Sequence, residues 1–227
     1  MDSTVVTADL ISPLGAYVRL RGLGEAAFLL ESVEQGRLGR YSFVGCGSRV
    51  VTLAEAERLG EPVVGYLGYE HAAELEPTVP VPAAGPDLPE SRFVVADTLV
   101  RFDHPGGVAE VLRGDPDGLQ AALDGPAPGL RARGGRAPGE TRRHPDRADY
   151  ERTVIRAKEH IRDGDVFQVV LSQRAERPTP AGAFDLYRAL RRVNPSPYLF
   201  LVEFPDLALI GSSPETLVKA EGRRASL

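Results

Sequence analysis

Two polar side chains stand out in this sequence because each accompanies a stretch that otherwise reads as buried. Gln168 lies in the middle of the apolar run "GDVFQVVLSQ", residues 164–173. Glu215 ends the turn-like sequence "GSSPE". A glutamine amide forms hydrogen bonds but supplies neither a nucleophile nor a titrating base, whereas a glutamate can transfer protons or help to hold a metal ion.

Alternation along an expected strand at 164–173 assigns Gln168 to the same face as Ser172. A buried amide without hydrogen-bond partners costs about 1–3 kcal/mol. Gln168 is therefore either satisfied by core or loop groups, or it points into a ligand cavity. Glu215 leaves a similar choice between a solvated carboxylate on a turn and a carboxylate in a site.

A strand-rich region is expected to precede these residues, from residue 16 to about residue 112. Its expected strands are short, rich in Val, Phe, Tyr and Leu, and separated by turns that contain glycine: "AYVRL", "AAFLLES", "RYSFVG", "RVVTL" and "SRFVVADTLVRF". Residues 53–60 predict a short helix that ends at Gly60, and the proline spacing in 76–90 predicts an extended loop.

The segment 113–147 is rich in Gly, Pro and Arg, and most of it reads as a linker between the region 1–112 and a second region, 148–227. Its stretch "DGLQAALDG" has room for two helical turns. No aromatic residues alternate with its arginines, so a solvated linker is favoured over a nucleic-acid patch.

Regular structure is expected to resume at Asp149, a candidate N-cap, with a helix that stops at Gly164. The strand 164–173 follows, and then a helix over 183–193 that carries Leu186, Leu190 and Val193 on one stripe. Strands are expected at 198–204 and 207–211, and another hairpin begins near Glu215. The sequence stops directly after that hairpin, so we expect it to be the front part of a longer chain.

Composition describes an ordinary globular protein of one or two domains, with 227 residues of which 42% are hydrophobic. The formal charge of -5 argues against nucleic acid as the main partner. The single cysteine, Cys46, excludes an internal disulfide and is expected to be a small core or turn residue. Neither a signal peptide nor a membrane span is evident, so a cytoplasmic location is expected.

Several long motifs in fixed order resemble the large subunit family of anthranilate synthase, component I, among the chorismate-utilising enzymes. The N-terminal matches are "FLLESVEQGRLGRYSFVG", "VVGYLGYE" and "VADTLVRFDH", and the later ones are "GDVFQVVLSQR", "NPSPYLFLVEF" and "LIGSSPETLVK". The resemblance implies an α+β fold in which two antiparallel sheets stack, with helices outside. It also implies that this chain holds only the N-terminal part of that fold.

The resemblance implies an enzyme that converts chorismate and ammonia to anthranilate and pyruvate in tryptophan biosynthesis. It further implies Mg2+ as cofactor and a glutamine amidotransferase subunit that supplies the ammonia. Gln168 would then be a catalytic-site residue that determines which product forms. Related enzymes carry a lysine there as nucleophile or base, and a glutamine amide can act as neither. Glu215 would lie near the magnesium and the reacting ring.

The resemblance also implies feedback inhibition by L-tryptophan, at a site formed by two distant segments. In "LLES", Glu31 would pair with the ammonium group and Ser32 would bind the amino-acid backbone, while Arg40 would steady the carboxylate. In "NPSPYL", the rigid wall for the indole ring would include the residues Pro197, Tyr198 and Leu199.

The family chain is about twice this length, and the histidine, carboxylate contacts and magnesium ligands that it needs match nothing in this sequence. We therefore expect this chain to be inactive alone. Two alternatives stay open: aminodeoxychorismate synthase component I, and a non-catalytic module that binds tryptophan.

Overall fold

The structure is a computed structural model that describes residues 4–7, 10–32, 39–81, 87–126, 128–129 and 139–226. The chain divides into two compact units. The first comprises residues 1–130 together with 183–227, and the second comprises residues 131–182. The predicted boundaries at 112 and 148 divide the chain by its sequence, whereas these units are defined by contacts. The division into regions 1–112, 113–147 and 148–227 stays a prediction.

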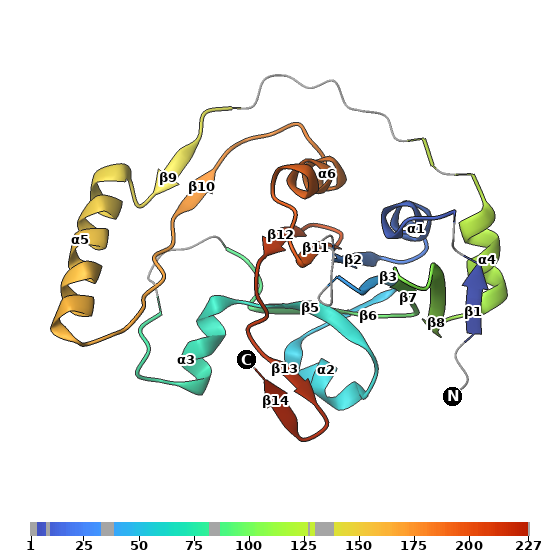
Figure 1. Ribbon diagram of the computed structural model, residues 1–227, viewed down its shortest axis with the longest axis horizontal. Helices are drawn as coiled ribbons and strands as arrows, with labels where there is room; N and C mark the ends of the chain where they lie inside the picture. Colours follow the sequence, from blue (N-terminus) through green and yellow to red (C-terminus); the bar gives the residue numbers. More distant parts are fainter. Residues whose placement is uncertain are drawn as a thin grey trace. The chain divides into compact units, whose positions relative to one another are not determined.

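An antiparallel sheet of seven strands forms the centre of the first unit. Its spatial order is β1-β8-β7-β3-β2-β11-β12, so that two strands from the C-terminal part extend a sheet begun by the N-terminal part (Figure 1). In chain order, the bounds of these strands are Thr4–Thr7 (β1), Ala26–Glu31 (β2), Tyr41–Gly47 (β3), Thr98–Asp103 (β7), Val108–Arg113 (β8), Tyr198–Glu203 (β11) and Ala208–Ser213 (β12).

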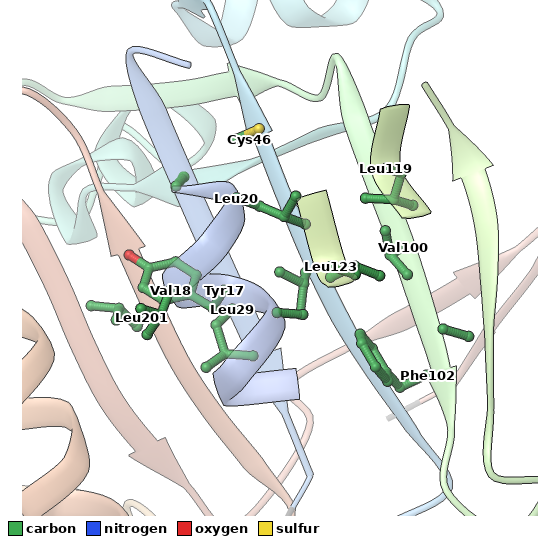
Figure 2. Close-up of a cluster of buried hydrophobic side chains, with 14 of the residues drawn as sticks. Tyr17, Val18, Leu20, Leu29, Cys46, Val100, Phe102, Leu119, Leu123 and Leu201 are labelled. Atoms are coloured by element: carbon green, nitrogen blue, oxygen red, sulfur yellow. The ribbon is translucent and has the colours of Figure 1, made fainter. Parts of the chain in front are cut away.

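Helices cover one face of this sheet. They are α1 (Pro13–Leu20), α4 (Pro116–Asp124) and α6 (Ala183–Val193), and they bury tyrosine, phenylalanine and leucine side chains against the strands. Figure 2 shows Leu29 of β2 among the side chains of α1, α4 and the neighbouring strands. Because strand residues alternate between faces, Ala27 and Leu29 face the helices, whereas Ala26 and Phe28 face away from them.

A second antiparallel sheet packs on the other face. It has the order β4-β6-β5, with bounds Arg49–Val51 (β4), Val63–Leu67 (β5) and Ser91–Val95 (β6). Phe28, Val94 and Phe204 belong to the cluster of buried side chains between the two sheets. The predicted fold class, α+β with antiparallel sheets and outer helices, is therefore confirmed.

Short elements complete the first unit. Helix α2 (Leu53–Leu59) begins at the capping box of Thr52 and Glu55 and ends at Gly60, whose φ of 60° favours glycine. The 3-10 helix η1 (Tyr69–His71), the helix α3 (Ala72–Leu75) and the hairpin of β13 (Lys219–Glu221) with β14 (Arg224–Ser226) follow along the chain. The predicted helix over 53–60 and the predicted C-terminal hairpin are confirmed.

The second unit consists of helix α5 (Arg147–Asp163) and a two-stranded ribbon of β9 (Arg142–His144) with β10 (Arg174–Glu176). Helix α5 ends at Gly164 as predicted, with φ 84° at that residue. Its N-cap is Asp146 rather than Asp149, because the Asp146 carboxylate accepts the backbone N–H of Asp149 at 2.9 Å.

Several other predicted segments correspond to elements of the structure. The predicted helix over 183–193 is α6, and the predicted strands near 198–204 and 207–211 are β11 and β12. Within the predicted linker, the "DGLQAALDG" stretch forms α4. The linker arginines at 131, 133 and 136 lie outside the described residues.

The predicted strand at 16–20 is wrong, because these residues form the end of helix α1. The Ser12 hydroxyl accepts the backbone N–H of Gly15 at 3.1 Å, and Pro13 occupies the first helical turn. Both are helix-start signals. Ala16, Tyr17 and Leu20 are fully buried, at the spacing of one helical face.

The predicted strand at 164–173 is also wrong in this structure. These residues pair with no described strand, and Phe167 is fully exposed. A strand is stabilised by a hydrogen-bonded partner and by a covered face. The apolar alternation therefore identified residues suited to a strand, but no strand in the described part of the chain forms backbone hydrogen bonds with them.

Cys46 lies in β3 and is buried, as predicted. Burial raises the pKa of its thiol, which opposes formation of a nucleophilic thiolate. Among the described residues, none of the helices has both the length and the apolar character that crossing a bilayer requires.

Leu29→Ala should lower the free energy of unfolding by about 2–4 kcal/mol, because it removes a fully buried side chain from beneath α1. Leu23→Ala is the matched control, since Leu23 is 61% exposed and should change stability by less than about 0.5 kcal/mol. Urea unfolding followed by circular dichroism measures both. Equal denaturation midpoints for the two variants would contradict the assignment of the core.

Candidate functional site

A cavity of about 480 Å³ lies in the first unit, at the ends of β2 and β7. Its wall includes the start of α1, the last turn of α6 and the residues that follow β7. The lining residues that carry chemistry are Glu31, Ser32, Asp103, His104 and Arg191. The cavity is thus lined by acidic, basic and hydroxyl groups together with apolar residues that include Ile11 and Phe102.

Glu31 is the most deeply buried charged group of this cavity, with 4% of the residue exposed. Strand alternation aims its side chain at the helix-covered face, where α6 supplies its partners. Arg191 donates from Nε at 2.7 Å to Oε2 and from Nη2 at 2.9 Å to Oε1, and the Tyr187 hydroxyl donates to Oε2 at 2.9 Å. This two-pronged pairing, with a third hydrogen bond, is the arrangement that makes a buried carboxylate tolerable.

The partners of Glu31 have shifted acid–base properties. Burial, and then the neighbouring carboxylate of Glu31, raise the pKa of the Tyr187 hydroxyl far above its ordinary range. The hydrogen bond to Glu31 raises the pKa of Arg191. Tyr187 and Arg191 therefore remain donors throughout the physiological pH range.

A second polar pair lies beside Glu31. The buried Ser42 hydroxyl is 2.8 Å from His104 Nε2, and Ser42 Oγ also accepts the backbone N–H of Ser32 at 3.3 Å. These contacts connect the end of β2 to the residue after β7. His104 lies in the turn that follows β7, and it also lines the cavity.

Arg40 lies on the exposed side of this region. It donates to Asp103 from Nε at 3.3 Å and from Nη2 at 2.8 Å, and 55% of its side chain is exposed. The hydrogen bond from Arg40 holds the pKa of the Asp103 carboxyl below its usual value. The predicted role of Arg40 with a ligand carboxylate stays a prediction, and in this structure its guanidinium is already paired.

The two segments predicted to form one binding site are brought together by the sheet. Leu199 of β11 is the register partner of Glu31 in β2, and the "NPSPYL" segment leads directly into β11. Leu199 itself is 1% exposed within the core, while Pro197 and Tyr198 are half-buried. None of these last three is among the described residues that line the cavity.

Ser196, also in "NPSPYL", is 7% exposed. Its hydroxyl is the one buried side-chain polar atom among the described residues that lacks a hydrogen-bond partner. Buried hydroxyl groups usually have a hydrogen-bond partner, so Ser196 distinguishes the "NPSPYL" segment from the rest of the core.

Gln168 and Glu215, the predicted catalytic residues, are both exposed. Gln168 belongs to the second unit, where its neighbours Val166, Val169 and Leu171 line an apolar groove of about 360 Å³ with α5. Glu215 belongs to the first unit, where its backbone carbonyl accepts the Ser213 hydroxyl at 2.9 Å. Their catalytic roles stay predictions.

One cluster among the described residues has the donor types to hold a metal ion, namely His71, Glu74 and Glu90. His71 Nδ1 lies 3.3 Å from Glu74 Oε2 and 2.9 Å from Glu90 Oε1, and both carboxylates are exposed. A set with an imidazole nitrogen does not suit Mg2+, which prefers oxygen ligands. This cluster therefore does not fit the magnesium expected from the resemblance.

Two residues that bind the Glu31 carboxylate, Tyr187 and Arg191, were not predicted from the sequence. Their four-residue spacing places them on one face of α6, together with the buried Phe184. That spacing was visible in "AFDLYRALRRV", but the stripe singled out there was Leu186, Leu190 and Val193. Of those three, Leu186 and Val193 are exposed in the structure.

Residues 25–227 match the family described as chorismate binding enzyme. Anthranilate synthase component 1 of Thermus thermophilus is 36% identical, in an alignment that covers 96% of this chain and 56% of that protein. The protein of the same name from Streptomyces coelicolor is 38% identical, with 95% and 51% covered. The chain thus spans about half the length of the curated relatives that it matches.

Solved structures agree with the fold. The crystal structure of anthranilate synthase component I from Streptococcus pneumoniae superposes with a TM-score of 0.62 at 25% identity, covering 96% of this chain and 59% of that one. MenF, the menaquinone-specific isochorismate synthase of Escherichia coli, also gives a TM-score of 0.62, at 18% identity and with 95% and 50% covered. The second likeness shows the fold alone.

Glu31→Gln should lower the free energy of unfolding by about 2 kcal/mol, because it leaves Arg191 without its counter-charge and faces the two donors with an amide. Asp103→Asn is the control, since it breaks the more exposed pair with Arg40 and should cost less. Urea unfolding at neutral pH measures both. A larger loss of unfolding free energy for Asp103→Asn would contradict the view that Glu31 contributes more to stability than Asp103.

Proposed function

This chain belongs to the chorismate binding enzyme family, and we propose that it is part of the large subunit of an anthranilate synthase. In this proposal the whole enzyme converts chorismate and ammonia to anthranilate and pyruvate in the cytoplasm, with Mg2+ as cofactor. A glutamine amidotransferase subunit supplies the ammonia. The relatives named anthranilate synthase component 1, at 36% and 38% identity, are the observation that carries the proposal.

The proposal assigns Gln168 a role in the choice of product. An amide at this position cannot attack the ring of chorismate or activate water, so ammonia remains the nucleophile that adds. Glu215 would act near the departing hydroxyl. Because the chain spans about half the length of its relatives, we further propose that residues 1–227 alone do not complete the reaction.

The proposal includes feedback inhibition by L-tryptophan. The pairing of Glu31 with Leu199 across β2 and β11 supports it, because one sheet brings the "LLES" and "NPSPYL" segments together. The cavity beside them carries Glu31 and Ser32, a carboxylate and a serine suited to an amino-acid ligand. Inhibition would be allosteric only if tryptophan and chorismate prefer different conformations.

Two other functions remain as alternatives. Aminodeoxychorismate synthase component I is disfavoured by a glutamine rather than a lysine at position 168. A non-catalytic module would bind tryptophan without taking part in chemistry. The polar cavity of the first unit fits both this module and the enzyme, so activity has to distinguish them.

Fluorescence titration tests the regulatory part of the proposal, because the chain contains no tryptophan. Excitation at the red edge of the indole band reports added L-tryptophan almost alone. We expect saturable binding, and Glu31→Ala should weaken it by at least ten-fold because the ammonium group loses its carboxylate. A folded chain that binds no tryptophan would remove the feedback proposal and favour the aminodeoxychorismate alternative.

Gln168→Lys, made in a chain extended to the length of the relatives, should lower the yield of anthranilate at least ten-fold and add products of a changed nucleophile. Gln173→Lys is the control, as the other exposed glutamine of the same segment. Liquid chromatography with mass detection measures the products from chorismate, ammonium and Mg2+. An unchanged product spectrum for Gln168→Lys would remove the main argument against aminodeoxychorismate synthase component I.

A further inference from the structure

Arg191 presents more hydrogen-bond donors to the cavity than its partner uses. A guanidinium carries five N–H groups. Glu31 accepts two of them, one from Nε and one from Nη2. The other three, on Nη1 and Nη2, have no hydrogen-bond partner among the described residues. Arg191 lines the cavity, and 34% of its side chain is exposed.

The orientation of this guanidinium is fixed from behind. Glu31 holds two N–H groups of one edge, and the Tyr187 hydroxyl in turn fixes the Glu31 carboxylate at 2.9 Å. Tyr187 is fully buried in the middle of α6. A planar fork held in this way loses little further freedom when an anion binds its other edge.

Glu31 also retains capacity. Its Oε2 accepts two hydrogen bonds, from Arg191 Nε and the Tyr187 hydroxyl, whereas its Oε1 accepts only the one from Arg191 Nη2. A carboxylate oxygen accepts about two. One wall of the cavity therefore offers a fixed cation and a free acceptor position next to each other.

We propose that Arg191 binds the carboxylate of the amino-acid ligand through its free Nη edge, while Glu31 receives the ligand's ammonium group. The inference rests on the proposed function, in which this cavity takes an amino acid. Adjacent opposite charges on the wall complement the adjacent ammonium and carboxylate groups of an α-amino acid, and they favour it over a plain amine or a plain acid.

The other cation near the cavity is less suited to this role. Arg40 already places Nε and Nη2 on the Asp103 carboxylate, at 3.3 and 2.8 Å, and it is not among the residues that line the cavity. An anion that binds near Arg40 also meets the charge of Asp103. His104 faces the cavity, but its Nε2 is engaged by Ser42 at 2.8 Å. Among the described residues that line the cavity, Arg191 is the arginine whose remaining N–H groups are not taken by a protein acceptor.

Binding of three related ligands to one variant series tests the inference. L-Tryptophan carries both charged groups, tryptamine lacks the carboxylate, and indole-3-propionate lacks the ammonium. Arg191→Gln keeps a donor for Glu31 but removes the charged fork. It should weaken tryptophan about ten- to hundred-fold and leave tryptamine within about three-fold of the unchanged chain.

Two further variants separate this role from a structural one. Arg192→Gln neutralises the next residue, which is exposed and does not line the cavity, and it should change neither affinity. Arg191→Lys keeps the charge and should recover part of the tryptophan affinity. Ligand fluorescence gives the affinities, and circular dichroism on the same samples verifies the fold.

The preference for tryptophan over tryptamine is the deciding quantity. If Arg191→Gln weakens both ligands equally, or neither, the inference is wrong. Thermal-shift measurements with a panel of α-amino acids test the role of Arg191 separately from the proposed feedback by tryptophan. An unchanged chain that binds another amino acid through Arg191, but not tryptophan, removes tryptophan as the ligand and supports Arg191. A folded chain that binds no amino acid overturns both.

Discussion

The register between β2 and β11 is the constraint on which the first unit depends. It pairs strands that are far apart in the sequence, with Leu199 opposite Glu31 and Leu201 opposite Leu29. Because side chains alternate between faces, a shift of one residue would turn Leu29 away from the helices and Glu31 away from Arg191. The same register thus determines the core and the polar cavity, so that neither can change without the other.

That register also places two carboxylates on the helix-covered face, with Glu31 buried and Glu203 half-buried. Glu31 of β2 and Glu203 of β11 both face the helix-covered side, and each receives a tyrosine hydroxyl from a helix: Tyr187 of α6 and Tyr17 of α1. Burial, reinforced by Glu203, also raises the pKa of Tyr17 well above its usual value. Arginines complete both pairs, at 3.6 Å between Arg21 and Glu203 and at 2.7 Å between Arg191 and Glu31. Two helices are thereby oriented on the sheet by charge pairing as well as by apolar contact.

Much of the fold followed from local patterns, and the failures have physical causes. Glycine at positions 60 and 164 correctly marked helix ends, because a left-handed backbone favours glycine there. Residues 16–20 look equally suited to a strand, and only the start signals at Ser12 and Pro13 reveal the helix. Glu31 was identified through resemblance, but its partner Arg191 lies 160 positions away. No local pattern states which arginine of α6 meets a carboxylate in β2, because that depends on how the helix docks.

The segment around Gln168 shows why a site on a segment without strand partners is harder to infer than one in a packed core. The apolar alternation of this segment shows that its residues are suited to a strand. Their exposure in the structure shows that the neighbouring described residues do not cover them. An uncharged amide can determine specificity only where the protein encloses the ring of the substrate beside it. Neighbouring strands would have to form that enclosure. The cavity around Glu31 differs in this respect, because its charged groups and their hydrogen-bond partners all lie within the first unit. The proposed ligand binding therefore rests on contacts within the first unit, and it can be tested separately from the proposed role of Gln168, which belongs to the second unit.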